Sequence, residues 1–281
     1  MTANVAGGDV RQAGREVTGS RWFHWLSRAG LVARGVMYLL IGSLAVQIGL
    51  GGGGKEADRK GALETVSNTP GGSVILWLLV VGFAGLALWR YAEAAFGQPV
   101  PDGRKMTKRA GSFGRGLFYS VAFAGILNFA LGGGAQSSNE QSKTLTAKAM
   151  EQPGGRWLVL AVGVGFVAWG IGNIVNALRR KFTKKLKTGE MSPPVRKVVK
   201  GLGLVGRSAR GVVFGAAGIF LAYAAITFDP DKAKGLDGTL RTFAGTPGGP
   251  WALVAVALGL LTFGVYSFCE ARWRKVEAVR S

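Results

Sequence analysis

The sequence predicts an all-α polytopic membrane protein with six transmembrane helices, arranged as three tandem helical-hairpin repeats in a pseudo-threefold bundle. Three observations predict this fold. A short motif occurs three times, each copy is followed at nearly the same distance by Pro-Gly-Gly, and the 281 residues are 48% apolar, in long runs rather than alternating patterns. Apolar runs of about 20 residues are long enough to cross the roughly 30 Å hydrocarbon core of a bilayer as helices.

The repeated motif has the form Gly-x-x-x-Arg-Gly, with an aromatic residue four positions after the Arg. Its copies are Gly30–Tyr38, Gly111–Tyr119 and Gly206–Phe214. The Arg of each copy precedes the Pro of the following Pro-Gly-Gly by 36, 38 and 37 residues. A period of this kind, with shared landmarks, indicates tandem copies of one structural unit.

Composition and turn residues divide the chain into seven parts. They are a disordered or interfacial tail (1–24), repeat 1 (25–97), a basic linker (98–110), repeat 2 (111–180), a long basic linker (181–203), repeat 3 (204–273) and a C-terminal tail (274–281). Each repeat holds two predicted spans, which lie at about 30–50, 73–96, 111–131, 157–178, 206–227 and 250–270. Apolar residues three or four positions apart precede each Pro-Gly-Gly and predict a short helix in each loop.

The basic residues lie mostly on one side of the predicted membrane. The termini, the linkers and the adjoining span ends carry 26 of the 35 basic and 7 of the 15 acidic residues, a net charge of +19. The loops within the repeats carry the other 9 and 8, a net charge of +1. Positive residues concentrate on the cytoplasmic side of membrane proteins with short loops. We therefore expect a multi-pass protein of the bacterial cell (inner) membrane, with both termini in the cytoplasm, and no nucleic-acid partner.

Residue types that support common catalytic chemistry are scarce. The chain has one Cys (Cys269) and one His (His24), so a cysteine metal cluster, a His-based metal site and a Ser-His-Asp triad are not expected. We expect no catalytic residues, no metal and no cofactor. The first 20 residues contain no apolar run typical of a cleavable signal peptide.

Charged and polar residues within the spans form the candidate site. Glu, Asn and Glu stand 23 residues after the Pro of each Pro-Gly-Gly. Because the two helices of a repeat are antiparallel, these residues should lie at the same depth as the motif Arg, and charges at such depth usually face the bundle with a partner. The predicted charge network is Arg34, Glu93, Arg115, Asn176, Arg210 and Glu270.

Three interpretations of this network stay open. In the first, Arg34–Glu93 and Arg210–Glu270 are ion pairs that lock each hairpin, and small residues let the helices approach. In the second, the three motif arginines surround a cavity for an anionic ligand, and Arg115, opposite a neutral Asn, is the most available. In the third, Arg34 reaches the lipid headgroups. The residues expected at the helix contacts are Gly30, Gly35, Tyr38, Gly111, Gly116, Tyr119, Gly206, Gly211 and Phe214.

The long linker is the densest basic segment of the chain and suggests contact with anionic phospholipids of the bilayer. The side chains expected at the lipid headgroups are Arg179, Arg180, Lys181, Lys184, Lys185 and Lys187.

The tripled Gly-x-x-x-Arg-Gly-x-x-Tyr/Phe unit, the Pro-Gly-Gly and the closing Glu-Ala resemble the DUF1206 family of bacterial membrane proteins. The resemblance covers about residues 25–275 and implies three copies of a two-helix domain in a membrane. It implies no activity. Repeat 2 departs from the pattern because Asn176 replaces the Glu.

These observations favour a structural or accessory membrane protein with buried Arg–Glu ties and anionic-lipid contacts. The alternative is a transporter or channel for a small anionic solute that uses the pseudo-threefold interior. A membrane enzyme is the least favoured class, because no nucleophile–base pair is evident. A polar cavity along the axis would favour transport, and a dry, packed centre would favour the structural role.

Overall fold

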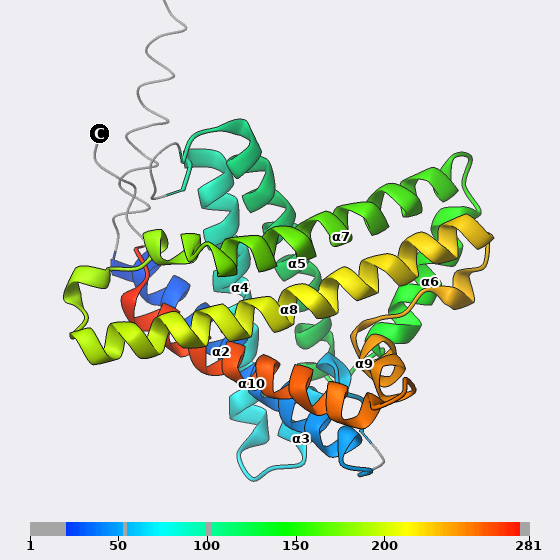
Figure 1. The fold of residues 1–281 in the computed structure, drawn as a ribbon, viewed down its shortest axis with the longest axis horizontal. Coiled ribbons are helices and arrows are strands. Elements are labelled where there is room, and N and C mark those ends of the chain that lie inside the picture. The colour runs from blue at the N-terminus through cyan, green and yellow to red at the C-terminus, as the bar shows by residue number, and fades with distance from the viewer. Residues whose placement is uncertain (1–20, 53–54, 99–102, 276–281) are drawn as a thin grey trace, which may run out of the picture.

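The structure is a computed structural model that describes residues 21–52, 55–98 and 103–275; the predicted tail over residues 1–20 lies outside the described part. Six long helices form the molecule (Figure 1). They are α2 (Arg21–Gly49), α4 (Gly72–Phe96), α5 (Met106–Ala130), α7 (Gly155–Leu178), α8 (Pro193–Thr227) and α10 (Gly249–Trp273). All six are long and apolar enough to cross a membrane. The predicted all-α, six-span fold is confirmed.

The outward faces of these helices are apolar. Leu78 on α4, Trp157 on α7 and Ile219 on α8 are well exposed although each lies in a long helix. Large contiguous apolar surfaces are rare on soluble monomers and mark a membrane or protein contact. On a six-span bundle this surface is the one that meets the hydrocarbon.

A short helix follows the first span of each repeat, as predicted. These helices are α3 (Arg59–Ser67), α6 (Ser138–Met150) and α9 (Leu236–Ala244). The Pro-Gly-Gly after each one makes the turn into the second span. Its first glycine has a positive φ, +76° at Gly71, +76° at Gly154 and +72° at Gly248, which a residue with a side chain rarely adopts. The repeated glycine is thus a backbone requirement of the hairpin.

The long helices pair between repeats rather than only within them. α4 runs beside α5, α7 beside α8, and α10 beside α2 (Figure 1). The hairpins of repeats 1 and 3 are also closed, because α2 packs on α4 and α8 packs on α10. The hairpin of repeat 2 is open, since α5 and α7 are not among the helix pairs that pack closely. The six helices therefore form a ring with one seam, which lies between α5 and α7.

The first glycine of the motif sets the contact within a repeat. A Cβ at Gly30 would stand 2.6 Å from the carbonyl oxygen of Gly82 on α4, and a Cβ at Gly206 would stand 2.5 Å from the Phe263 backbone on α10. Both glycines let the two helices of a hairpin approach, as predicted. Gly111 was expected to do the same in repeat 2. It is exposed and meets only the side chain of Arg115, so this prediction is wrong, because α7 is not there to contact.

The second glycine of the motif sets the contact between repeats. Gly35 faces Gly264 of α10, Gly116 faces the ring of Tyr91 on α4, and Gly211 faces the Gly170 carbonyl on α7, with Cβ distances of 3.1, 2.8 and 2.8 Å. All three contacts join the first helix of one repeat to the second helix of another. The aromatic residue that closes the motif packs at the same interfaces, as in the edge-to-face pair of Tyr38 with Phe263, 4.7 Å between ring centroids.

Three helices begin earlier than the predicted spans. α2 begins at Arg21, within the predicted tail, and α5 begins at Met106, within the first basic linker. α8 begins at Pro193 and has 35 residues, so its first turns occupy half of the predicted linker 181–203. Pro at the start of a helix is favourable because its missing N–H would have no helical partner. A helix of 35 residues is about 52 Å long and must project beyond a 30 Å core.

Hydrogen bonds at the ends of the short helices join all three repeats. The Asp58 carboxylate caps α3 and also accepts the backbone N–H of Ser138 at 2.5 Å. The Asn139 side chain accepts the N–H of Gly235 at 3.2 Å, and the Asp237 carboxylate accepts the N–H of Ala57 at 2.8 Å. Repeat 1 is thereby bonded to repeat 2, repeat 2 to repeat 3, and repeat 3 back to repeat 1. We call this end of the bundle the loop end.

Loss of one of these bonds should weaken the whole molecule. Asp237→Ala leaves the buried Ala57 N–H and the Arg241 side chain without their acceptor, so we expect a loss of about 1–3 kcal/mol and a lower Tm in detergent. Asp231→Ala is the matched control, because Asp231 makes an exposed ion pair with Lys143. Equal Tm values for the two variants would show that the hydrogen-bonded ring does not hold the repeats together.

Candidate functional site: a buried charge cluster

Charged side chains gather at the end of the bundle opposite the loop end. This end contains the starts of α2, α5 and α8 and the ends of α4, α7 and α10, and we call it the basic end. Its centre is an ion pair of Arg34 on α2 with Glu270 on α10, in which both side chains are almost fully buried. Arg34 Nε also donates to Ser267 Oγ at 3.1 Å.

The predicted pairing within repeats is therefore wrong. Arg34 pairs with the Glu of repeat 3 and not with Glu93 of its own repeat. The physical reason is the helix arrangement: α2 packs along α10 through Gly35 and Gly264, which carries Arg34 to the Glu270 side of the helix. The first helix of the chain is thus tied to the last.

Glu93 is held by other partners. Arg90, one turn earlier on α4, donates to its Oε2 at 2.6 Å, and Ser112 on α5 donates to the same oxygen at 3.1 Å. The other carboxylate oxygen lies 3.7 Å from Arg274. Since Glu93 and Ser112 lie on neighbouring repeats, this carboxylate also makes a contact between repeats.

Arg274 links the two carboxylates. Its NH1 donates to Glu270 Oε1 at 2.7 Å, while its NH2 faces Glu93, and the guanidinium lies over the Trp89 ring at 4.5 Å from the centroid. Arg207 adds a longer contact of 4.0 Å to Glu270. The predicted C-terminal tail 274–281 therefore begins with a buried residue of the site.

Arg210 does not pair with Glu270, contrary to the prediction. Its guanidinium is surrounded by four aromatic rings at 4.9–5.5 Å from their centroids, and among the described residues it makes no ion pair. The rings are Tyr38, Trp169, Phe214 and Phe263. Cation–π contacts in a desolvated place can contribute about 2 kcal/mol, so this cage is an alternative to a carboxylate.

Arg115 and Asn176 do not meet. Arg115 is half-buried and its Nε donates to the Gly111 carbonyl of its own helix at 2.7 Å. Asn176 is exposed, because the seam separates α5 from α7. We expected Arg115 to lack a carboxylate partner because Asn176 replaces the Glu of the other repeats. Among the described contacts Arg115 makes no ion pair, but the reason is that α5 and α7 do not pack together.

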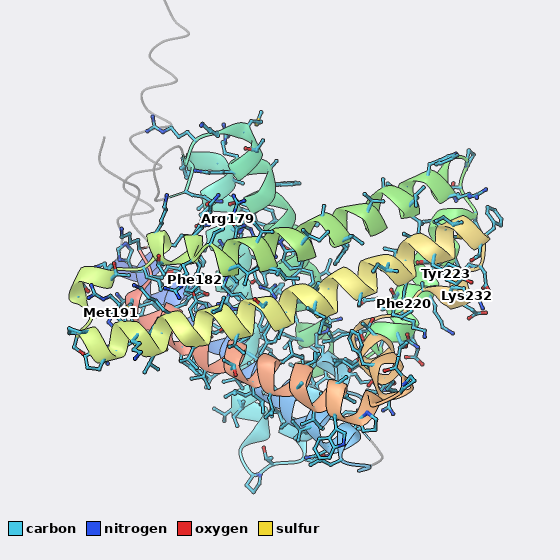
Figure 2. The ribbon with its side chains drawn as sticks, in the orientation of Figure 1. Arg179, Phe182, Met191, Phe220, Tyr223 and Lys232 are labelled. Carbon is cyan, nitrogen blue, oxygen red and sulfur yellow. The ribbon has the colours of Figure 1, made fainter. Side chains whose placement is uncertain are left out.

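The long linker folds back onto the cluster. Phe182 is buried with its ring 5.6 Å from that of Tyr266, and Met191 is buried at the turn into α8 (Figure 2). Lys185 donates to Gln98 at 2.8 Å, and Gln98 in turn donates to Ser112 at 2.8 Å. A chain of hydrogen bonds thus runs from the linker to Glu93.

The six predicted lipid-contact residues fall into two groups. The exposed side chains, free to face a membrane surface, are Arg179, Arg180, Lys181 and Lys184. Lys187 instead pairs with Glu190 at 3.2 Å. Lys185 points inward, and its pKa is lowered, first by burial and then by the nearby charges of Arg274 and Arg115.

The cluster has more positive than negative charge. Its basic members are Arg34, Arg90, Arg115, Lys185, Arg207, Arg210 and Arg274, and its acidic members are Glu93 and Glu270. Such a surplus in a partly dry place attracts an anion. Among the described residues no three His, Cys, Asp or Glu side chains lie close enough to hold a metal ion.

Sequence reasoning missed several members of this cluster. Arg274 stands four residues after Glu270, and Arg207 stands three residues before Arg210, so both spacings place them on a shared helix face with a predicted site residue. That signal could have found them. The role of Ser112 and Gln98 depends on how α4 and α5 pack, which no spacing shows.

Comparison with known proteins agrees with this architecture. The sequence profile of the Domain of Unknown Function DUF1206 matches three times, at residues 29–97, 110–180 and 205–274. The chain belongs to the DUF1206 family. It is 33% identical over 251 residues to the uncharacterized protein YxxB of Bacillus subtilis (strain 168), a match that covers 89% of this chain and 90% of that protein. No solved structure matches. The predicted resemblance is confirmed, and this family carries no stated activity.

The tie between the first and last helices can be measured by a double-mutant cycle. Arg34→Ala and Glu270→Ala should each cost about 3–5 kcal/mol, because each leaves a buried charge without its partner. Their coupling in thermal unfolding should be about 1–3 kcal/mol. The control cycle combines Arg34→Ala with Glu93→Ala, two cluster residues that bind different partners, and should show coupling near zero. Equal coupling in both cycles would contradict the pairing.

Proposed function

We propose that this DUF1206 protein is a structural or accessory protein of the bacterial cell (inner) membrane, with both termini in the cytoplasm. The six apolar helices support a multi-pass position in a bilayer. The orientation rests on the charges, because the basic end carries nearly all of the surplus positive charge. The basic end would then face the cytoplasm and the loop end the outside.

The observation that carries the structural role is the use of the two carboxylates. Glu270 binds Arg34 of repeat 1, and Glu93 contacts Ser112 of repeat 2, so both join different repeats. Charges are costly inside a bilayer and are retained where they pair or serve a function. Here their pairing holds neighbouring repeats together.

Anionic phospholipids are the partners that the basic end fits best. Four exposed basic side chains, at positions 179, 180, 181 and 184, lie together just beyond α7, and Arg115 lies half-buried nearby in the cluster. Each basic residue near an anionic surface contributes about 1 kcal/mol of attraction. This role requires no catalytic residue, no cofactor and no nucleic acid, and we propose none.

A transporter or channel for a small anionic solute is the second candidate. The surplus of positive charge around Arg115 favours it. The packing around Arg210 disfavours it, because Arg210 is enclosed by aromatic side chains and two of these rings, Tyr38 and Phe263, pack edge to face. We therefore place the structural role first.

Orientation can be tested by cysteine labelling. In a Cys269→Ala background, Gly133→Cys at the loop end should react with an impermeant reagent added to intact cells. Lys184→Cys, an exposed position at the basic end, should react only after the cells are broken. The reverse pattern would overturn the proposed orientation.

Lipid contact can be tested by removing charge from the linker. The variant with Arg179, Arg180, Lys181 and Lys184 all changed to Gln should lose at least about tenfold of the preference for phosphatidylglycerol over phosphatidylcholine in mixed nanodiscs at low salt. The control changes Lys55, Lys60, Lys143 and Lys148 to Gln, four basic residues of the loop end. Salt should reduce the preference of the wild type. If neither salt nor the linker variant changed the preference for phosphatidylglycerol, this role would be excluded. If reconstituted vesicles took up anions and Arg115→Gln stopped the uptake, transport would be favoured instead.

A further inference from the structure

An apolar cavity lies on the seam side of the bundle. Its volume is about 300 Å³. Its sides are formed mainly by α2, α5 and α8, with one residue each from α4 and α7, and α3, α6 and the start of α9 bound it at the loop end. The residues of its walls include Tyr119 and Ala122 on α5, and Val213, Ala217 and Leu221 on α8. Because α5 and α7 do not pack closely, this side of the bundle is open toward the surrounding lipid.

The seam has a cause in the sequence. In repeats 1 and 3 the position 19 residues after the Pro is a large buried aromatic residue, Trp89 and Tyr266, and in repeat 2 it is Gly172. A Cβ at Gly82 or Gly259 would clash with the first helix of its own repeat, whereas one at the equivalent Gly165 would meet nothing within 4 Å. Repeat 2 thus keeps the glycine that allows close helix contact in the other two repeats, but its own helices, α5 and α7, do not pack together.

Two cations lie at the loop-end side of the cavity. Arg59 donates to Gln141 at 3.1 Å and to the Val121 carbonyl at 3.4 Å, and Lys234 donates to the Thr242 hydroxyl at 2.7 Å. Both residues line the cavity, and these three hydrogen-bond acceptors are neutral. Burial lowers the pKa of Arg59, and the nearby Asp58 carboxylate opposes this shift. Arg34 also lines the cavity, toward the basic end, but its charge is paired with Glu270, so the cations available to a ligand are Arg59 and Lys234. The cavity therefore suits a molecule with an apolar chain and an anionic group at the loop end.

We propose that the cavity binds an anionic phospholipid of the membrane, with one acyl chain between α5 and α8 and the headgroup phosphate at Arg59 and Lys234. The chain would extend from the loop end toward Tyr119. One turn of a partner helix, about 10 Å wide and 5.4 Å high, occupies roughly 400 Å³ and exceeds this volume, whereas part of a narrow acyl chain fits it. This lipid site lies at the opposite end from the linker residues proposed above and does not depend on them.

The experiment uses the full-length protein in nanodiscs and counts tightly bound phosphatidylglycerol by native mass spectrometry. Ala217→Trp fills the cavity and should reduce retention of the lipid at least tenfold. Ile219→Trp is its control, because Ile219 lies on the same helix with its side chain exposed outside the cavity. Ala122→Leu serves as a milder second filling variant and should reduce retention in the same direction if Ala217→Trp does not fold.

The headgroup position is tested by changing Arg59 and Lys234 together to Gln. We expect this variant to lose about tenfold of its preference for phosphatidylglycerol over phosphatidylcholine, while Lys55→Gln with Lys60→Gln keeps it. The linker variant described above should retain the lipid. Unchanged retention in both filling variants would overturn the proposal, as would an unchanged headgroup preference. Displacement by oleate but not by phosphatidylglycerol would identify a free fatty acid instead, and a change of oligomeric state in Ala217→Trp would identify a protein partner.

Discussion

The contact of the first helix with the last is the constraint on which the rest of the structure depends. Three tandem hairpins could form an open row, in which each unit touches only its neighbours, as in linear repeat proteins. Here α10 returns to α2, and the pair Arg34–Glu270 joins them at the basic end while Asp237 and Ala57 join repeats 3 and 1 at the loop end. Contacts at both ends bring the three repeats together, although the helices leave one gap, between α5 and α7. The charge pairs cross between repeats because they stabilise the contacts that join one repeat to another.

The middle repeat differs from the other two because its two long helices, α5 and α7, do not pack on each other. Its neighbours hold it on both outer sides, through α4 on α5 and through α8 on α7, so its own two helices need not touch. Replacement of a large aromatic residue by Gly172 and of Glu by Asn176 is tolerated there for the same reason. In repeats 1 and 3 equivalent changes would remove buried packing or strand a buried Arg. The contacts of repeat 2 with its neighbours therefore allow the seam that its own sequence leaves between α5 and α7.

Much of the fold could be predicted from the sequence. The length of the spans, the tripled motif and the Pro-Gly-Gly turns depend on local chemistry, and all three can be identified in the sequence. The pairing of Arg34 could not be predicted, because Glu93 and Glu270 stand at the same predicted depth. α2 packs on both α4 and α10, and only its rotation about its own axis decides which of the two helices Arg34 faces. The aromatic cage of Arg210 was hidden for a similar reason, since its rings come from four different helices. The bonds among Asp58, Asn139 and Asp237 occupy slightly different places in each repeat, so no periodic signal marked them.

The three motif arginines show what a repeated residue can and cannot indicate. The same position holds an ion pair in repeat 1, an aromatic cage in repeat 3 and a bond to its own helix in repeat 2. Arg34 and Arg210 are both buried, and protein groups replace water around their guanidinium groups. Their charges therefore stabilise contacts between repeats. Arg115 keeps partial access to solvent, makes no ion pair among the described residues, and lies on α5, the helix that also forms one side of the seam. Of the three motif arginines, Arg115 is therefore the one whose charge the contacts between repeats do not use.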